Sequence, residues 1–83
     1  MPLGLETLEP NHVADARNVP CPGPLLTVKE SIALVDVGQV LELKATDQGA
    51  REDLPAWAKK SGNEYLGSVP HDGYDSHFIV RRK

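Results

Sequence analysis

The sequence is poor in the features that stabilise or anchor many small proteins. It holds a single cysteine, which excludes an internal disulfide, in a chain of 83 residues. The three histidines, His12, His71 and His77, do not have zinc-ligand spacing, so we expect no metal. No stretch approaches the ~18 apolar residues of a membrane span. Residues 1–10 have neither the basic start nor the apolar run of a signal peptide.

An excess of positive charge is also missing. The formal net charge is -3, and the sequence pI is about 5.5. This balance argues against direct nucleic-acid binding, which favours a basic face. A free cysteine without an export signal indicates the reducing cytoplasm. The length allows one domain, residues 1–83, which we expect to be a monomer without a cofactor.

The apolar spacing predicts two helices. Prolines at 22 and 24 mark the start of the first, since the first helical turn tolerates proline. It runs for about 13 residues, and its apolar stripe is Leu25, Val28, Ile32 and Val35. The second has Pro55 early and ends at Gly62. Acidic residues in its first turn and basic residues in its last suit the helix dipole: Glu52, Asp53, Lys59 and Lys60.

Four strands alternate with these helices. We expect the first three at Val13–Ala16, Val40–Thr46 and Glu64–Val69. A hairpin connection, His71–Ser76, contains an Asp-Gly turn signal. In the last strand either Phe78 and Val80, or His77 and Ile79, line the inner face.

The predicted element order is β-α-β-α-β-β, an α+β fold. Two helices on one face of a mixed four-stranded sheet would bury both apolar stripes in a two-layer α/β sandwich. A right-handed crossover makes the first two strands parallel. Residues 1–11 form a loose lead-in, in which Leu3, Leu5 and Leu8 cover part of the core. A turn is expected at Asn18, which tolerates positive φ.

Cys21 is the candidate for chemistry because it lies at the start of the first helix. Free amides and the positive end of the helix dipole favour the thiolate there, and would also stabilise a persulfide anion. Pro22 and Pro24 stiffen the chain and remove amide donors, so Gly23 and Leu25 supply the nearest free amides. Gly23 also lets a partner approach the sulfur closely. A lone cysteine is otherwise often a small buried hydrophobe.

Nearby charged and aromatic residues have open roles. Arg17 either contacts a partner or an anion, or is a solvated loop cation. Asp15 either orients Arg17 or serves a turn. Asp47 follows the second strand at the sheet edge that delivers Cys21, as a partner contact or as a helix cap. Trp57 is expected in the core, and Tyr74 packs in the hairpin or touches a partner.

The segment Cys21-Pro22-Gly23-Pro24-Leu25-Leu26 resembles the core motif of the TusA (SirA-like) sulfur-carrier family. The resemblance covers roughly residues 12–83, and it includes Asp15-x-Arg17, Asp47, Trp57, Lys60 and Gly62. It implies a sulfur-transfer protein whose cysteine carries sulfane sulfur as a persulfide. A cysteine desulfurase or a rhodanese would be the donor, and a DsrE-like or TusD-like protein the acceptor.

Such a relay feeds tRNA thiolation, molybdenum-cofactor synthesis or dissimilatory sulfur oxidation in that family. The resemblance implies a sulfurtransferase that acts stoichiometrically more than as a stand-alone enzyme. Two alternatives stay open. A non-catalytic interaction or regulatory module of the same fold would keep its function after Cys21→Ser. A thiol redox protein is disfavoured because the chain has no second, resolving cysteine.

Overall fold

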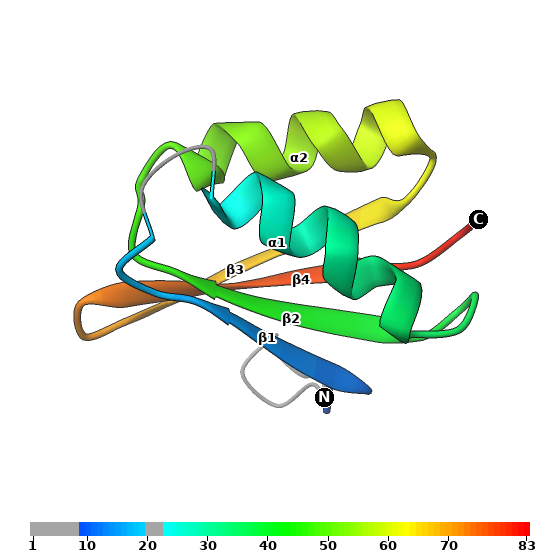
Figure 1. Cartoon of the computed structure of the whole chain (residues 1–83), viewed down its shortest axis with the longest axis horizontal. Coiled ribbons are helices and arrows are strands. Elements are labelled where there is room, and N and C mark those ends of the chain that lie inside the picture. Colours follow the sequence, from blue (N-terminus) through cyan, green and yellow to red (C-terminus); the bar gives the residue numbers. More distant parts are fainter. Residues whose placement is uncertain (1–8, 20–22) are drawn as a thin grey trace, which may run out of the picture.

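The computed structural model describes residues 9–19 and 23–83. Within these ranges lie four strands, two α-helices and one short 3-10 helix (Figure 1). Their bounds in chain order are β1 His12–Ala16, α1 Gly23–Ser31, η2 Ile32–Leu34, β2 Val40–Ala45, α2 Ala50–Ser61, β3 Glu64–His71 and β4 Tyr74–Val80. The predicted order β-α-β-α-β-β is confirmed. The expectations for Leu3, Leu5 and Leu8 lie outside the described residues.

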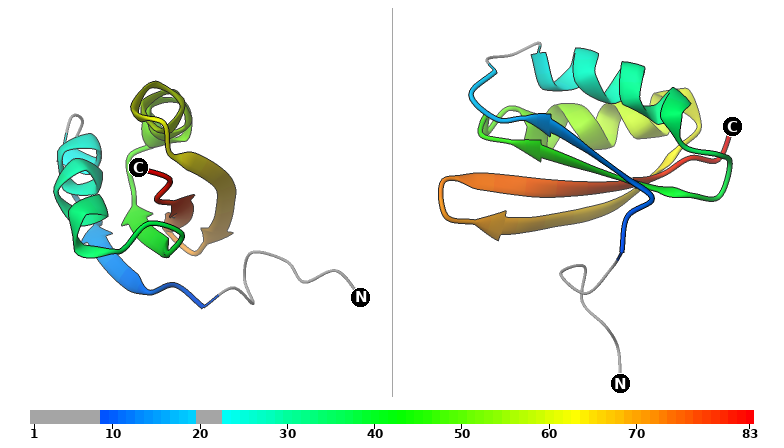
Figure 2. Two further views of the ribbon diagram at one scale, coloured as in Figure 1. Left: turned by 90° about the vertical axis from the view of Figure 1, so that its right-hand side faces the viewer. Right: turned by 60° about the horizontal axis from the view of Figure 1, so that its bottom comes forward.

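The strands form one mixed sheet in the order β1-β2-β4-β3. β1 and β2 are parallel, and β4 pairs antiparallel with both β2 and β3. Both helices lie on the same face of this sheet (Figure 1), and Figure 2 shows the two layers from other sides. The two-layer α+β prediction is therefore confirmed.

The core lies between the sheet and the helices. Leu41 and Leu43 of β2 are completely buried, as are Val28 of α1 and Leu54 of α2. The burial of each leucine side chain stabilises the fold by about 1.5–3 kcal/mol. Leu41 pairs with Ile79, which joins the same apolar cluster. Since side chains alternate along a strand, the pair His77 and Ile79 faces the helices, and Phe78 and Val80 point to the opposite face.

The first helix is shorter than the expected length of about 13 residues. α1 ends at Ser31, and the 3-10 helix η2 continues the chain to Leu34. A 3-10 turn is a common way to tighten a helix end, here closed by the Val35 amide on the Ile32 carbonyl at 3.4 Å. The apolar stripe is still used, because Val28 and Val35 are buried and Leu25 and Ile32 pack on the core.

The turns follow the expected glycine and asparagine chemistry. Asn18 has φ 63°, which confirms the predicted turn there. Gly62 ends α2 with φ 83°, and the Asn63 amide reaches the Ala58 carbonyl at 2.8 Å. The hairpin is tighter than predicted, because β3 runs to His71 and β4 begins at Tyr74, with Gly73 at φ 86° between them.

Candidate functional site

Cys21 and Pro22, the centre of the predicted site, lie outside the described residues. Their frame is described. β1 ends at Ala16, and α1 begins at Gly23, two residues after Cys21 in the sequence. The first turn of α1 contains no acidic residue. The positive end of the α1 dipole is therefore not offset within its own first turn.

The start of α1 is closely packed. Pro24 is buried and Leu25 half-buried, and the Thr27 hydroxyl donates to the Gly23 carbonyl at 3.0 Å. A Cβ added to Gly23 would lie 1.9 Å from Cγ1 of Val19. Gly23 is thus required for a contact within the chain, a role that the sequence did not predict.

Arg17 and Asp15 form a two-pronged ion pair. The Arg17 Nε and Nη2 donate to the two carboxylate oxygens of Asp15 at 3.0 and 2.9 Å, and the Arg17 amide adds a bond of 3.0 Å. These hydrogen bonds from Arg17 lower the pKa of Asp15 to about 2. Of the two roles open for Asp15, orienting Arg17 is the one that this geometry supports.

Asp47 supports the turn that precedes α2. Its carboxylate accepts from the Gly49 amide at 3.3 Å, and its carbonyl accepts from the Ala50 amide at 3.2 Å. The carboxylate bonds the turn and not an amide inside the helix, as a short acidic side chain commonly does. Partner contact by Asp47 stays a prediction.

Three connections meet at one edge of the sheet. Ala16 pairs with Ala45, and Ala45 pairs with Asp75, so the ends of β1 and β2 lie beside the β3–β4 hairpin. The Asn18 amide donates to the Thr46 hydroxyl at 2.9 Å, which ties the chain before Cys21 to the end of β2. The expectation that Asp47 and the end of β1 share an edge is confirmed by this register.

Tyr74 joins these connections. The Arg17 guanidinium lies 5.2 Å from the centre of the Tyr74 ring, and Lys44 lies 6.0 Å from it. His71 stacks on the same ring at 4.7 Å. We call Arg17, Asn18, Thr46, His71 and Tyr74 the edge cluster. Sequence reasoning missed Thr46 and His71, because only the strand order brings the hairpin to the end of β1.

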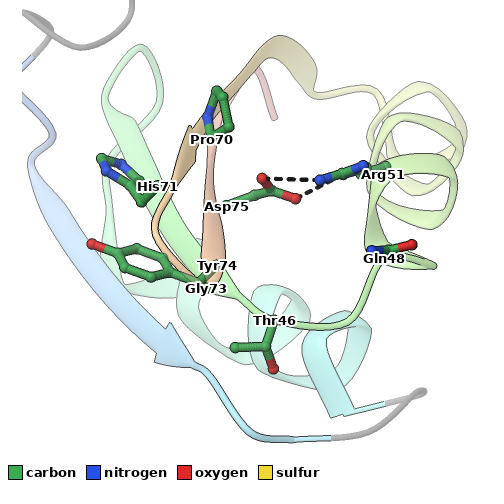
Figure 3. A pocket seen from close by; sticks show the side chains of 8 residues that line it. All are labelled: Thr46, Gln48, Arg51, Pro70, His71, Gly73, Tyr74 and Asp75. Atoms are coloured by element: carbon green, nitrogen blue, oxygen red, sulfur yellow. Dashed lines mark hydrogen bonds and ion pairs between the residues drawn. The ribbon is translucent and has the colours of Figure 1, made fainter.

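A pocket of about 240 Å³ opens beside the edge cluster (Figure 3). Arg51 and Asp75 form one wall, with Arg51 Nε and Nη2 donating to the carboxylate at 2.7 and 3.3 Å. The Arg51 hydrogen bonds hold the pKa of Asp75 below its ordinary value. The other lining residues are Thr46, Gln48, Pro70, His71, Gly73 and Tyr74.

Two further features concern a metal site and a membrane-spanning helix, neither of which the sequence predicts. Over residues 9–19 and 23–83, histidine and acidic side chains form no group of three that could hold a metal ion. No described helix is long and apolar enough to cross a membrane.

These observations define a class of protein: a small two-layer α+β domain whose single cysteine lies between β1 and the start of α1. A comparison with family models identifies the class further. The model described as sulfurtransferase TusA matches residues 12–82, and the chain belongs to this family.

Individual relatives agree with this assignment. The putative sulfur carrier protein YrkF of Bacillus subtilis is 42% identical over 67 residues, which cover 81% of this chain but only 36% of that protein. The sulfur carrier protein TusA of Allochromatium vinosum is 38% identical over 68 residues, with coverage of 82% and 88%. The crystal structure of a SirA-like protein from Desulfitobacterium hafniense superposes with a TM-score of 0.69 at 25% identity, covering 87% of this chain and 99% of that one.

Proposed function

We propose that this chain carries sulfane sulfur, as a persulfide on Cys21, from a donor protein to an acceptor protein. The observation that carries the proposal is the start of α1 at Gly23, two residues after the only cysteine, with no acidic residue in its first turn. A helix start of this kind favours a thiolate, which is the nucleophile of sulfur exchange. Membership of the TusA family supports the same role.

The chemistry needs no oxidant and no cofactor. The Cys21 thiolate attacks the outer sulfur of a donor persulfide, forming a new S–S bond while the donor S–S bond breaks and the donor thiolate leaves. An acceptor thiolate then attacks the outer sulfur on Cys21. This second step breaks the S–S bond on Cys21 and restores its thiolate, so each exchange leaves the electron count unchanged.

The edge cluster places a guanidinium near the end of β1. Arg17 is held by Asp15 and by the face of Tyr74, and its side chain is 41% exposed. A guanidinium fixed in this way is suited to contact an anionic group of a partner. Asp47 is a second partner contact in this proposal.

Membership of the family supports a proposal for the partners and the compartment. We propose a cysteine desulfurase or a rhodanese as donor, a DsrE-like or TusD-like protein as acceptor, and a cytoplasmic relay that serves tRNA thiolation or dissimilatory sulfur metabolism. The chain acts stoichiometrically in this relay.

Intact mass spectrometry tests the loading step. We expect incubation with glutathione persulfide to add one sulfur atom (~32 Da), which a thiol reductant removes because thiolates cleave such S–S bonds. Cys21→Ser is the control and should gain no mass. An unmodified wild-type protein would favour the alternative of a non-catalytic interaction module.

A further inference from the structure

A groove runs between the two helices on the side of the molecule away from the sheet. Leu25 and Lys29 of α1 are one helical turn apart and form one wall. The other wall is a stripe of α2 at matching helical spacing. The groove has a volume of about 260 Å³, and the described residues that line it are Leu25, Lys29, Asp53, Ala56, Trp57 and Lys60.

The floor of the groove is apolar and firmly anchored. Leu25 and Trp57 are half-buried and pack against the core cluster. Ala56 lies between Asp53 and Trp57 along α2 and is exposed, so its small side chain leaves room above it. Such a floor accepts an aliphatic or aromatic side chain from outside.

The rim of the groove is basic although the chain as a whole is acidic. Lys29 and Lys60 are both exposed, and among the lining residues these two lysines outnumber the single aspartate, Asp53. The formal net charge of the chain is -3. A basic rim around an apolar floor complements a segment that carries acidic side chains beside an apolar anchor.

The groove also begins close to Cys21 in the sequence. Leu25 belongs to the first turn of α1 and follows Cys21 by four residues. The pocket at the edge cluster is a weaker candidate, because Arg51 there is already neutralised by Asp75. A protein that exchanges sulfur with Cys21 must dock beside the start of α1, where this groove begins.

We propose that the groove between α1 and α2 is the docking site for an acidic segment of the protein that exchanges sulfur with Cys21, and that an apolar side chain of this segment sits over Ala56 between Leu25 and Trp57. The identity of the partner as a sulfur-exchange protein rests on the proposed function. The groove and its charge do not depend on it.

Trp57 makes the test direct, because it is the only tryptophan of the chain and lines the groove. The probe is a synthetic helical peptide in which glutamates flank two leucines one helical turn apart. We expect a saturable change in Trp57 fluorescence that weakens with added salt. A matched peptide with lysines in place of the glutamates should give none.

Charge reversal locates the binding. We expect Lys29→Glu with Lys60→Glu to weaken binding of the acidic peptide by about tenfold, from the loss of two rim attractions and the gain of two repulsions. Lys59→Glu is the matched control for Lys60→Glu alone, since Lys59 is exposed in the same last turn of α2 but does not line the groove. Ala56→Glu should abolish binding by filling the floor with bulk and charge.

The outcomes separate this proposal from the proposed function. No fluorescence change with the acidic peptide, or equal losses for the single variants Lys59→Glu and Lys60→Glu, would overturn the docking site. Loading of Cys21 by glutathione persulfide requires no docked protein and should be the same in all of these variants. A groove that binds the peptide in a protein whose Cys21 cannot be loaded would instead refute the sulfur carrier.

Discussion

At the scale of single residues, His77 places a titratable side chain inside the apolar core. It is completely buried, and its Nδ1 lies 2.8 Å from the Tyr65 hydroxyl. Its Nε2 is buried and has no hydrogen-bond partner among the described residues. Burial lowers the pKa of His77 below its ordinary 6.5, with Arg51 lowering it and Asp75 opposing the shift. The neutral imidazole is therefore the form that the fold accepts.

This burial predicts a loss of stability in mild acid. The unfolded chain binds a proton at His77 near pH 6.5, whereas the folded chain binds it only at lower pH. Stability from the neutral ring is thus complete above pH 6.5 and falls as the pH drops towards the folded pKa, by at most about 1.4 kcal/mol per pH unit.

Urea unfolding between pH 7.5 and pH 5 measures this effect. We expect His77→Leu, which keeps an apolar side chain of similar size, to flatten the pH dependence over this range. His12 and His71 are present in both proteins and serve as an internal control. An equally steep fall in the leucine variant would show that another group is responsible.

The conformations and contacts of single residues could be predicted from the sequence to different extents. The positive φ of Asn18 follows from local backbone preferences and was predicted. The Asp15–Arg17 pair was one of two options, because neighbours in a loop have several geometries of similar energy. The contact of Gly23 with Val19 was not predicted, since it depends on how the chain folds back on itself.

At the scale of elements, the start of α1 is joined to the chain that leads into it. Val19 and Gly23 flank residues 20–22, and they are in close contact, as the 1.9 Å between Cγ1 of Val19 and an added Gly23 Cβ shows. Val19 is 37% exposed, so it is not fixed by the core alone. The two described residues on either side of residues 20–22 are therefore in van der Waals contact.

Gly23→Ala tests the contact between Val19 and Gly23, because the contact and helix propensity change the free energy of unfolding in opposite directions. Propensity alone predicts that alanine stabilises a helical position by about 0.5–1 kcal/mol. We expect instead a destabilisation of about 1–3 kcal/mol, because the methyl group overpacks against Val19. Thermal unfolding gives the comparison.

Val19→Ala combined with Gly23→Ala is the matched control. Removal of the Val19 branch frees the space, so the double variant should regain most of the lost stability. A stabilised Gly23→Ala protein would contradict the close contact.

The helices and strands themselves were largely predictable, but not their ends. Apolar spacing and capping residues located α2 up to Gly62, because these signals are local. The switch from α1 to the 3-10 helix at Ile32 was missed, since the apolar stripe continues through it. Pro55 stands sixth in α2, later than expected, where it removes only the bond to the Arg51 carbonyl.

At the scale of the whole molecule, the topology brings distant segments to one place. The right-handed crossover predicted that β1 and β2 are parallel. The insertion of β4 between β2 and β3 places Tyr74, on whose ring His71 stacks, next to Arg17, and no local pattern encodes that neighbour relation. The role of Cys21 thus stays a prediction from the sequence, whereas the edge cluster around the end of β1 could not be predicted from it.

A carrier must release its sulfur as well as accept it, and the release tests the central claim most directly. The protein is first loaded with one sulfur and freed of donor. It is then mixed with a small acceptor thiol, cysteamine, with no dithiothreitol present, and its intact mass is measured over time. We predict that the added ~32 Da disappears from the protein and is recovered in equal amount as the acceptor persulfide plus the sulfide that a second acceptor thiol releases from it. Sulfur that stays on the protein, or leaves it and is recovered in neither form, would contradict a carrier.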